Sequence, residues 1–262
     1  MSEAVGSKEE VSALARGLAL LKTIGMAAAP MGNRDLADTT GIPKATVSRL
    51  TATLVGAGYL RQSRDSERFS LGPALLDMSS RYLRHFDLRT VARPHLTELS
   101  EFAGASIHVG VRDELDMLVI DSLRPRSALI SSRIELGTRL PIATSAAGRA
   151  YLAALPQPEQ AVLLEQIRTE TGENWPTVEP GLLAGIEEYA RLGYCSSFGE
   201  WHPHIHALGF ALQGPGGERY GLSCAGPAYL LPKDVMLSRV APRLQEIAQR
   251  IAKEAGTAAD AG

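Results

Sequence analysis

The sequence predicts an α+β protein with a small, mostly helical N-terminal domain and a larger domain in which helices flank an antiparallel sheet. Residues 9–56 space their apolar side chains as helices do, and residues 59–71 have a hairpin pattern. From Leu88 onward, strand-like alternation and helical segments follow one another. Residues 11–70 hold eight Lys or Arg against four Asp or Glu, whereas residues 71–262 hold 18 against 22. A basic module joined to an acidic one favours nucleic acid as a partner of the first part only.

The composition is that of an ordinary globular protein. The chain has 262 residues, 45% of them hydrophobic and 21% charged, which excludes a disordered chain, a collagen-like chain and a disulfide scaffold. No run approaches the ~18 uninterrupted apolar residues of a membrane-spanning helix. The first ten residues lack the apolar core of a secretion signal, and Cys195 and Cys224 are the only cysteines. We therefore expect a cytoplasmic protein with reduced thiols and no membrane contact.

The first helix is predicted over about 9–28, because apolar residues recur there at helical spacing. Its expected buried stripe consists of Val11, Leu14, Leu18 and Leu21. Asn33 is expected to cap a short second helix over 34–40, and Gly41 to supply a tight turn after it.

A third helix follows, with Pro43 in its first turn and Gly56 and Gly58 at its end. Its expected buried seam consists of Val47, Leu50 and Leu54. Residues 59–71 have apolar flanks around a polar centre and predict a two-stranded hairpin. Helix, short helix, turn, helix and hairpin in this order predict a winged helix-turn-helix domain, with the third helix as recognition helix.

The outward face of the third helix is small and polar, as a DNA major groove requires, although an ordinary solvated helix face has the same composition. Arg49 can form two hydrogen bonds with a guanine edge, and hydroxyl groups and Lys44 can bind phosphates. The arginines of the hairpin suit phosphate or minor-groove contacts. The predicted DNA-binding residues are Arg34, Lys44, Ala45, Thr46, Ser48, Arg49, Thr53, Arg61, Arg64 and Arg68.

The segment 73–87 predicts a linker helix with apolar residues on two sides, which is typical of a helix that pairs with another chain. These residues are Leu75, Leu76, Met78, Tyr82, Leu83 and Phe86. The alternative is a linker that folds against its own domain.

The larger domain alternates predicted helices and strands. Helices are expected over about 88–103, 144–155, 157–168, 179–192 and 232–255. Strands are expected over 105–112, 117–121, 205–213 and 219–225. This pattern predicts an antiparallel sheet with helices at one or both sides.

In combination and order, five stretches resemble the IclR family of bacterial transcription regulators across nearly the whole chain. They are LARGLALLKTI, NRDLADTTGIPKATVSRLTATLVGAGYL, RFSLGPALLDM, ELGTRLPIATSAAGRAYLAALP and YGLSCAGP. The resemblance implies a winged helix-turn-helix domain (9–71), a linker and dimerisation helix (72–88) and a GAF-like effector-binding domain (89–258). It also implies homodimers or homotetramers on partly palindromic double-stranded DNA.

The strongest candidate for a ligand site is the predicted helix start at Thr144, because a helix N-terminus presents unpaired N–H groups to an anion. The alternative is that its small residues only permit close packing. The resemblance implies that backbone amides at Ala146 and Ala147 hold the carboxylate of a small organic acid, and that Ser223 touches the ligand. A serine bonded within its own sheet is the alternative for Ser223. The predicted effector residues are Thr144, Ser145, Ala146, Ala147, Glu200, Trp201, His204, His206 and Ser223.

The histidines of 200–206 also permit a metal hypothesis, because Glu200, His202, His204 and His206 would share one strand face. Pro203 interrupts such a strand, and we expect pocket side chains around Trp201 and no metal. His108 is expected to be a satisfied sheet histidine, and the alternative is a ligand-binding group. An acidic ligand contact of some relatives has no sure counterpart, with Ser196, Ser197 and Glu200 as the nearest options.

No sequence motif of a hydrolase, metalloprotease or nucleotide-binding loop is present, so we expect neither catalysis nor a cofactor. The sequence therefore predicts a DNA-binding regulator controlled by a small organic acid, with aromatic or larger acids weakly favoured. One alternative is an enzyme or metabolite sensor whose winged helix binds protein. Another is an architectural DNA-binding protein without an effector.

Overall fold

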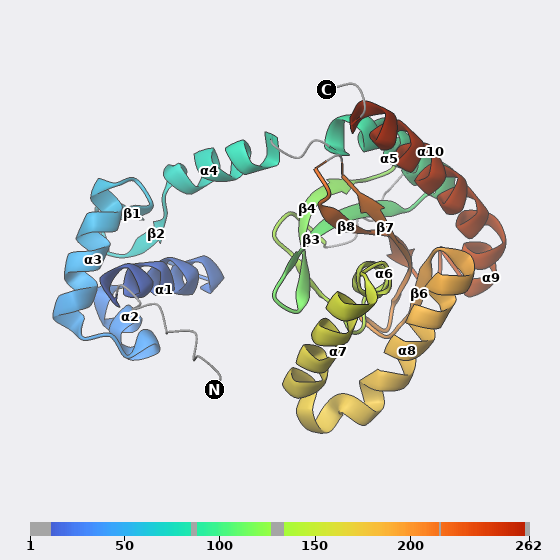
Figure 1. The fold of residues 1–262 in the computed structure, drawn as a ribbon. Coiled ribbons are helices and arrows are strands. Elements are labelled where there is room, and N and C mark those ends of the chain that lie inside the picture. The colour runs from blue at the N-terminus through green and yellow to red at the C-terminus, as the bar shows by residue number, and fades with distance from the viewer. Residues whose placement is uncertain (1–11, 85–87, 127–133, 215, 260–262) are drawn as a thin grey trace, which may run out of the picture. The chain divides into compact units, whose positions relative to one another are not determined.

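The computed structural model describes residues 12–84, 88–126, 134–214 and 216–259 (Figure 1). The chain divides into two compact units, Met1–His85 and Phe86–Gly262. Val11 and Phe86, which belong to the predicted stripe and linker, lie outside the described residues. Within the described residues, no helix has the length and apolar character needed to cross a membrane.

The first unit has the predicted order of helices followed by a hairpin. Its elements are α1 (Ser12–Met26), α2 (Asn33–Thr40), α3 (Lys44–Gly56), β1 (Leu60–Gln62), β2 (Phe69–Leu71) and α4 (Pro73–Arg84). The two strands are antiparallel, with Arg61 opposite Ser70. In α4, Leu76, Met78 and Tyr82 are exposed within this unit.

The predicted apolar stripe of α1 is wrong at Leu14 and Leu18, whereas its member Leu21 packs against the core. Leu14 is 63% exposed and Leu18 is 56% exposed, whereas Gly17, Leu20 and Ile24 face the core. Two apolar sets are interleaved on this helix, and spacing alone does not decide which one the neighbouring elements cover. The core of the unit consists of Leu20, Ile24, Leu36, Ile42, Val47, Leu60 and Phe69.

The turns around α2 follow the expected chemistry with shifted positions. Gly32, rather than Asn33, is the N-cap, and its N–H donates to Asp35 Oδ2 at 3.0 Å. Asn33 instead accepts a hydrogen bond from Thr51 Oγ1 at 3.1 Å, which joins α2 to α3. Gly41 has φ 69° and ends α2 in the left-handed conformation, as predicted. Pro43 directly precedes α3 as its N-cap.

The second unit is built on one antiparallel sheet of order β5-β4-β3-β8-β7-β6. Its strands are β3 (Ser106–Asp113), β4 (Asp116–Leu123), β5 (Arg139–Pro141), β6 (Cys195–Phe198), β7 (Ile205–Gln213) and β8 (Arg219–Pro227). The two edge strands, β5 and β6, are not predicted from the sequence. Both are too short to show a clear alternation of apolar and polar residues.

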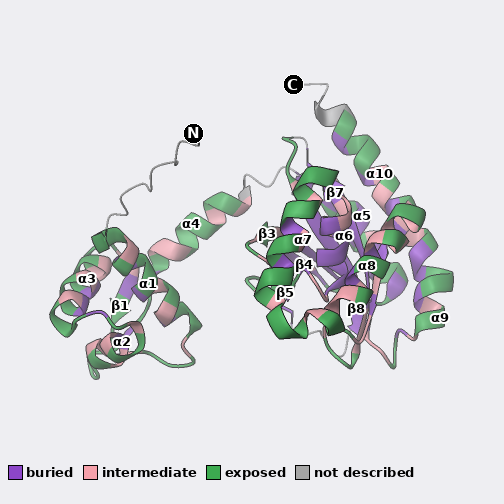
Figure 2. Cartoon of the chain, turned by 60° about the horizontal axis from the view of Figure 1, so that its bottom comes forward, coloured by how far each residue is buried: buried purple, intermediate pink, exposed green. Residues whose placement is uncertain are grey.

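Helices lie on both faces of this sheet (Figure 1). They are α5 (Leu88–Ala103), α6 (Ala146–Ala153), α7 (Gln157–Thr171), α8 (Trp175–Leu192), α9 (Lys233–Val235) and α10 (Ala241–Ala259). A 3₁₀ turn at Gly172–Asn174 precedes α8, and a π turn at Met236–Val240 joins α9 to α10. α5 and α10 cover one face, and α6 covers the other beneath α7 and α8. Figure 2 shows that α6 is buried along most of its length.

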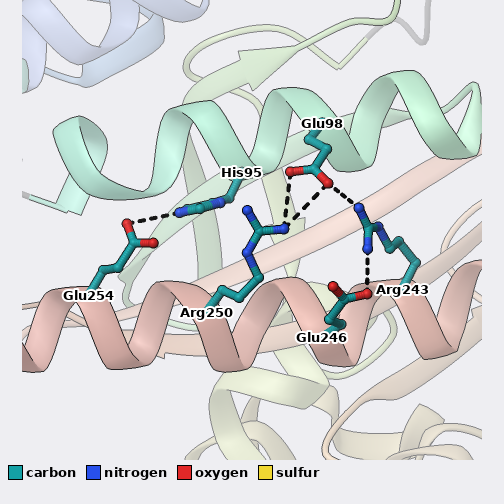
Figure 3. A network of polar contacts seen from close by, with 6 residues as sticks. All are labelled: His95, Glu98, Arg243, Glu246, Arg250 and Glu254. Carbon is teal, nitrogen blue, oxygen red and sulfur yellow. Dashed lines mark hydrogen bonds and ion pairs between the residues drawn. The ribbon is translucent and has the colours of Figure 1, made fainter.

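A polar network joins α5 to α10 (Figure 3). Glu98 accepts hydrogen bonds from Arg243 and from Arg250, the latter at 3.2 Å, and His95 Nε2 lies 2.9 Å from Glu254 Oε2. Partly exposed ion pairs of this kind each contribute about 0–1 kcal/mol. The buried apolar side chains Leu96, Leu99, Leu244, Ile247 and Ile251 therefore contribute most to the stability of this helix pair.

Candidate functional site

The outward face of α3 is available to a partner. Lys44, Ala45, Ser48, Arg49 and Thr53 are exposed, and Thr46 is half-buried. On the inner side Val47 is fully buried and Leu50 and Leu54 are partly buried, which matches the expected seam. Buried Thr51, which the sequence analysis did not place in the core, donates its hydroxyl to Asn33 Oδ1 or to the α3 backbone.

The basic residues of this unit differ in how they are engaged. Within the described part of the chain, Arg49, Arg61 and Arg64 form no ion pair. Arg34 lies 3.8 Å from Asp38, and both side chains are well exposed.

Arg68 has structural contacts that the sequence analysis did not foresee. Its Nη1 donates to the Pro30 carbonyl at 2.8 Å and to Asp35 Oδ2 at 3.0 Å. The Gly32 N–H and then Arg68 lower the pKa of Asp35. Arg68 thus links the hairpin to the start of α2, and its guanidinium is less available to DNA than those of the other wing arginines.

In the second unit, glycines allow α6 to lie directly on the sheet. A Cβ at Gly209 of β7 would stand 1.9 Å from the Ala146 carbonyl oxygen, and one at Gly221 of β8 would stand 2.6 Å from that of Ala147. Within α6, a Cβ at Gly148 would stand 2.3 Å from Ile142 Cα. Because any side chain at these positions would collide with backbone, the first turn of α6 is fixed against β7 and β8.

The N-terminus of α6 has the donors that an anion needs. Helix α6 begins at Ala146, two residues after the predicted start, and Ser145 is its N-cap. Ser145 Oγ accepts the N–H of Gly148 at 3.1 Å. The first amides of a helix have no acceptor inside the helix, so those of Ala146 and Ala147 remain as donors.

A small cavity lies beside this helix start. Its volume is about 20 Å³, and its lining is Ile134, Leu140, Ser145, Ala146, Ala147, Ser197, Trp201, Ile205, Ala207, Ser223 and Ala225. Three of these residues have hydroxyl groups, and the rest are apolar. A volume of this size holds one or two water molecules, so an organic molecule needs the lining to move apart.

The structure brings together five of the predicted effector residues. Ser145, Ala146, Ala147, Trp201 and Ser223 all line the cavity.

Thr144 is adjacent to the cavity without lining it, and its carbonyl accepts the Ser197 hydroxyl at 2.9 Å. Ser197, which is one of the options for the acidic ligand contact of some relatives, lines the cavity. Ala207 and Ala225 also line it, although they are not among the predicted effector residues. Ser197 lies on β6. Because this strand is not predicted from the sequence, the face of the sheet towards which its side chains point could not be predicted either.

His206 is wrongly predicted as a pocket residue. Side chains alternate along β7, and Ile205 and Ala207 face the cavity, so His206 faces the opposite side of the sheet. There its Nδ1 lies 2.8 Å from the Leu231 carbonyl oxygen, and its ring meets the Phe198 ring edge-on at 5.1 Å.

His204 and Glu200 also lie outside the cavity lining. His204 is exposed, and its N–H donates to His202 Nδ1 at 3.3 Å. Within the part of the chain that is described, no group of three His, Cys, Asp or Glu side chains is placed to hold a metal ion.

Glu200 pairs with a buried arginine that the sequence analysis did not single out. Arg149 is 4% exposed, and its Nη1 donates to the Ser196 carbonyl at 3.2 Å and lies 3.4 Å from Glu200 Oε1. Gly181 and Gly185 of α8 leave room for its side chain. Burial opposes ionisation of Glu200, but backbone hydrogen bonds and the charge of Arg149 outweigh it and lower its pKa. This ion pair fixes the position of Glu200, which directly precedes the cavity-lining residue Trp201.

The two cysteines are buried. Burial, and then the charge of Glu188, raise the pKa of the Cys195 thiol, which donates to the Gly185 carbonyl at 3.1 Å. Burial raises the pKa of Cys224 to about 12. Both thiols are therefore protonated at neutral pH, and neither fits a catalytic nucleophile.

Comparison with protein families matches both parts of the chain. The model of the IclR helix-turn-helix domain matches residues 13–64, and that of the bacterial transcriptional regulator IclR C-terminal domain matches residues 80–253. The HTH-type transcriptional regulator TsaQ1/TsaQ2 of Comamonas testosteroni is 31% identical over 93% of this chain and 88% of its own.

Solved structures agree with this result. The structure of an IclR family transcriptional regulator from Brucella abortus superposes with a TM-score of 0.85 at 35% identity, over 97% of this chain and 96% of the other. An IclR homolog from Microbacterium hydrocarbonoxydans, solved in complex with 4-hydroxybenzoate, shares the fold with a TM-score of 0.72 at 22% identity, over 94% and 99% of the two chains.

Proposed function

Because the chain belongs to the IclR family of DNA-binding transcription regulators, we propose that a small organic acid bound beside α6 controls its binding to an operator. The first domain (9–71) binds the operator, the linker (72–88) joins two chains, and the effector domain (89–258) binds the acid. The protein acts in the cytoplasm as a homodimer or homotetramer. The observation that carries the effector proposal is the cavity at the start of α6.

For DNA, the support comes from the exposed face of α3. Ala45 and Ser48 are small enough for close approach, and Arg49 is long enough to bind a guanine edge with two hydrogen bonds. Lys44 and the wing residues Arg61 and Arg64 hold phosphates. A symmetric dimer presents two such helices, which fits a partly palindromic operator.

For the effector, the support comes from the chemistry of the cavity lining. The amides of Ala146 and Ala147 suit a carboxylate, because a helix N-terminus favours negative charge. Trp201 and the alanines suit an apolar or aromatic body, and Ser223 offers a hydroxyl. The Microbacterium hydrocarbonoxydans homolog binds an aromatic carboxylate, which supports the same class of ligand for this chain.

The size of the cavity determines how the acid acts. The protein must separate Trp201 and Ile134 from α6 before an acid of several carbon atoms fits into about 20 Å³. The acid therefore binds an opened conformation better than the closed one. If the DNA-binding domains are arranged differently in the two conformations, binding of the acid changes the affinity for the operator. The size of this change is limited by the difference between the acid's affinities for the two conformations.

The test is a titration of the full-length protein against duplex DNA from the promoter of its own gene, measured by fluorescence anisotropy with and without a panel of organic acids. We expect a salt-sensitive complex whose dissociation constant changes at least fivefold with one acid. Ser223→Leu, which fills the cavity, should remove the response to that acid, and Ser223→Ala should keep it. An acid that is turned over, or that binds without changing DNA affinity, contradicts the proposal. So does an operator complex that no acid affects.

A further inference from the structure

His108 has a buried nitrogen atom without a hydrogen-bond partner. The residue is 1% exposed, and its Nε2 and the Nε of Arg243 are the two orphaned side-chain polar atoms among the buried residues that the structure describes. Arg243 has other guanidinium contacts, whereas His108 has only two ring nitrogens. Buried polar groups in folded proteins are nearly always paired, so this orphan points to a ligand. The expectation that His108 is a satisfied sheet histidine is wrong for this atom.

The register of the sheet places His108 on the same face as the cavity. His108 of β3 stands opposite Ser223 of β8 and Ser122 of β4. Directly opposed residues of antiparallel strands project to the same face, with Cβ atoms about 5 Å apart. Ser223 lines the cavity, and therefore His108 stands one strand further along the same face.

The strand order places β3, the strand of His108, between the strands that form two walls of the cavity. Ser223 and Ala225 of β8 line it on one side, and Leu140 of β5 lines it on the other. In the sheet, β3 and β4 lie between β8 and β5. Leu140 is level with Arg112 of β3, whereas Ser223 is directly opposite His108. A cavity that widens past Ser223 towards β3 therefore meets His108.

The protonation of His108 favours a neutral polar partner. Burial, and to a smaller extent the charge of Arg124, lower the pKa of His108 to about 4, so the ring is neutral at pH 7. Its Nδ1 lies 3.2 Å from Ser122 Oγ, and the serine can act as donor or as acceptor. Nε2 is therefore an acceptor in one tautomer and a donor in the other. A hydroxyl group suits both.

We propose that His108 is a second polar anchor of the effector site, and that the effector is a carboxylic acid with a hydroxyl group at the end away from its carboxylate. This inference rests on the proposed function. The start of α6 lies over β7 and β8, and His108 is on β3, so one to two strand spacings, roughly 5–10 Å, separate the two polar ends. A hydroxyl group across an aromatic ring or a short chain from the carboxylate spans this distance.

The experiment measures binding of three matched pairs of acids to the full-length protein by calorimetry. The pairs are 4-hydroxybenzoate and benzoate, 4-hydroxyphenylacetate and phenylacetate, and 6-hydroxyhexanoate and hexanoate. We expect the hydroxylated member of at least one pair to bind about tenfold more tightly, which one hydrogen bond to a buried group supplies. His108→Phe should abolish this preference and leave the affinity of the unsubstituted acid within about twofold.

The matched control is His206→Gln, because His206 lies on the other face of the same sheet and glutamine can still donate to the Leu231 carbonyl. It should leave the preference unchanged. Because His108→Phe alters a buried site, ¹⁵N spectra of histidine-labelled native protein provide a second measurement. The Nε2 signal of His108 should move on addition of the hydroxylated acid and stay in place with its unsubstituted partner.

Equal affinities within every pair, or a preference that survives His108→Phe, would overturn the role of His108 and leave the proposed function standing, provided the acids still change operator binding. If none of the six acids binds, the proposed ligand class is wrong as well. If other organic acids then change operator binding, only the general proposal that an acid controls the protein is supported.

Discussion

Gly209 of β7 lies directly beneath Ala146 of α6, so that a Cβ at position 209 would stand 1.9 Å from the Ala146 carbonyl oxygen. The start of α6 is therefore positioned by close backbone contact as well as by packing of Ala146 on Ala207 and Ala225. Whatever binds the amides of Ala146 and Ala147 is held at a fixed height above the sheet.

Gly209→Ala should lower the free energy of unfolding by at least about 1–3 kcal/mol, because the new methyl group has to push α6 away from β7. It should also weaken binding of the organic acid. Chemical denaturation measures the first effect and calorimetry the second. The control is Gly256→Ala in α10, where nothing lies within 4 Å of an added Cβ and a gain in stability of up to about 1 kcal/mol is expected. Equal stability of both variants would show that the contact is relaxed in solution.

Arg49→Ala should weaken operator binding by about 1–3 kcal/mol and reduce discrimination between operator and unrelated DNA, because it removes a contact with a base edge. Arg64→Ala should weaken binding to both DNAs alike and reduce its salt dependence. Anisotropy titrations at two salt concentrations separate these outcomes. If Arg49→Ala weakens both DNAs equally, α3 does not read bases through Arg49.

Arg68→Ala should act mainly through stability of the first domain, because Arg68 binds Asp35 and the Pro30 carbonyl at the base of the wing. We expect a lower melting temperature. We also expect binding to operator and to unrelated DNA to fall in proportion to the fraction of protein that is unfolded. Arg61→Ala, which breaks no ion pair among the described residues, is the control for loss of charge alone. An unchanged melting temperature for Arg68→Ala would return Arg68 to the DNA-contacting set.

The Arg149–Glu200 pair should give a pH-dependent contribution to stability. Because the pKa of Glu200 is lowered in the folded protein, the contribution is present above its ordinary value of 4.5 and is lost as the pH falls below it. The advantage of the native protein over Glu200→Gln should therefore shrink in acid, by less than about 1 kcal/mol since Glu200 is partly exposed. Glu187→Gln, an exposed carboxylate without an ion pair in the described chain, should show no such change. If stability changes with pH in the same way for Glu200→Gln and Glu187→Gln, the Arg149–Glu200 ion pair does not contribute to stability.

His108 should give a separate and larger pH dependence. Its pKa is about 4 in the folded protein and near 6.5 in the unfolded chain, so unfolding takes up a proton between these values. Stability is retained above pH 6.5 and is lost progressively as the pH falls towards 4, by at most roughly 3 kcal/mol. His108→Phe should flatten this part of the profile in urea unfolding. A profile identical to that of the native protein would place the titrating group elsewhere.

Much of the architecture could be predicted from the sequence, because long periodic segments determine it. The bounds of β7 agree with the prediction at both ends, and the order of helices and hairpin in the first domain is confirmed. The failures arise where two patterns compete or where an element is short. Leu14 and Leu20 both belong to apolar sets on α1, and only the packed neighbours show that Leu20 is inside.

The parts of the candidate site that depend on local sequence, such as a helix start, could be predicted. The parts that depend on which face of a strand meets the cavity could not. The sequence predicts a helix start at Thr144, two residues before the observed start at Ala146, and the cavity lies there. His206 fails because one residue along a strand reverses the face. Ser197 and Arg149 depend on contacts with segments about 50 positions away in the chain, which no local pattern contains.

The tightness of the cavity beside α6 has a consequence for sensitivity. Because the cavity is too small for the acid, part of the binding free energy is used to separate Trp201 from its neighbours. The observed affinity equals the affinity of the open conformation multiplied by the fraction of molecules that are already open. The concentration at which a gene responds is then set by this opening equilibrium as much as by the contacts with the acid. Substitutions that loosen the packing of Trp201 would lower the threshold without touching the ligand.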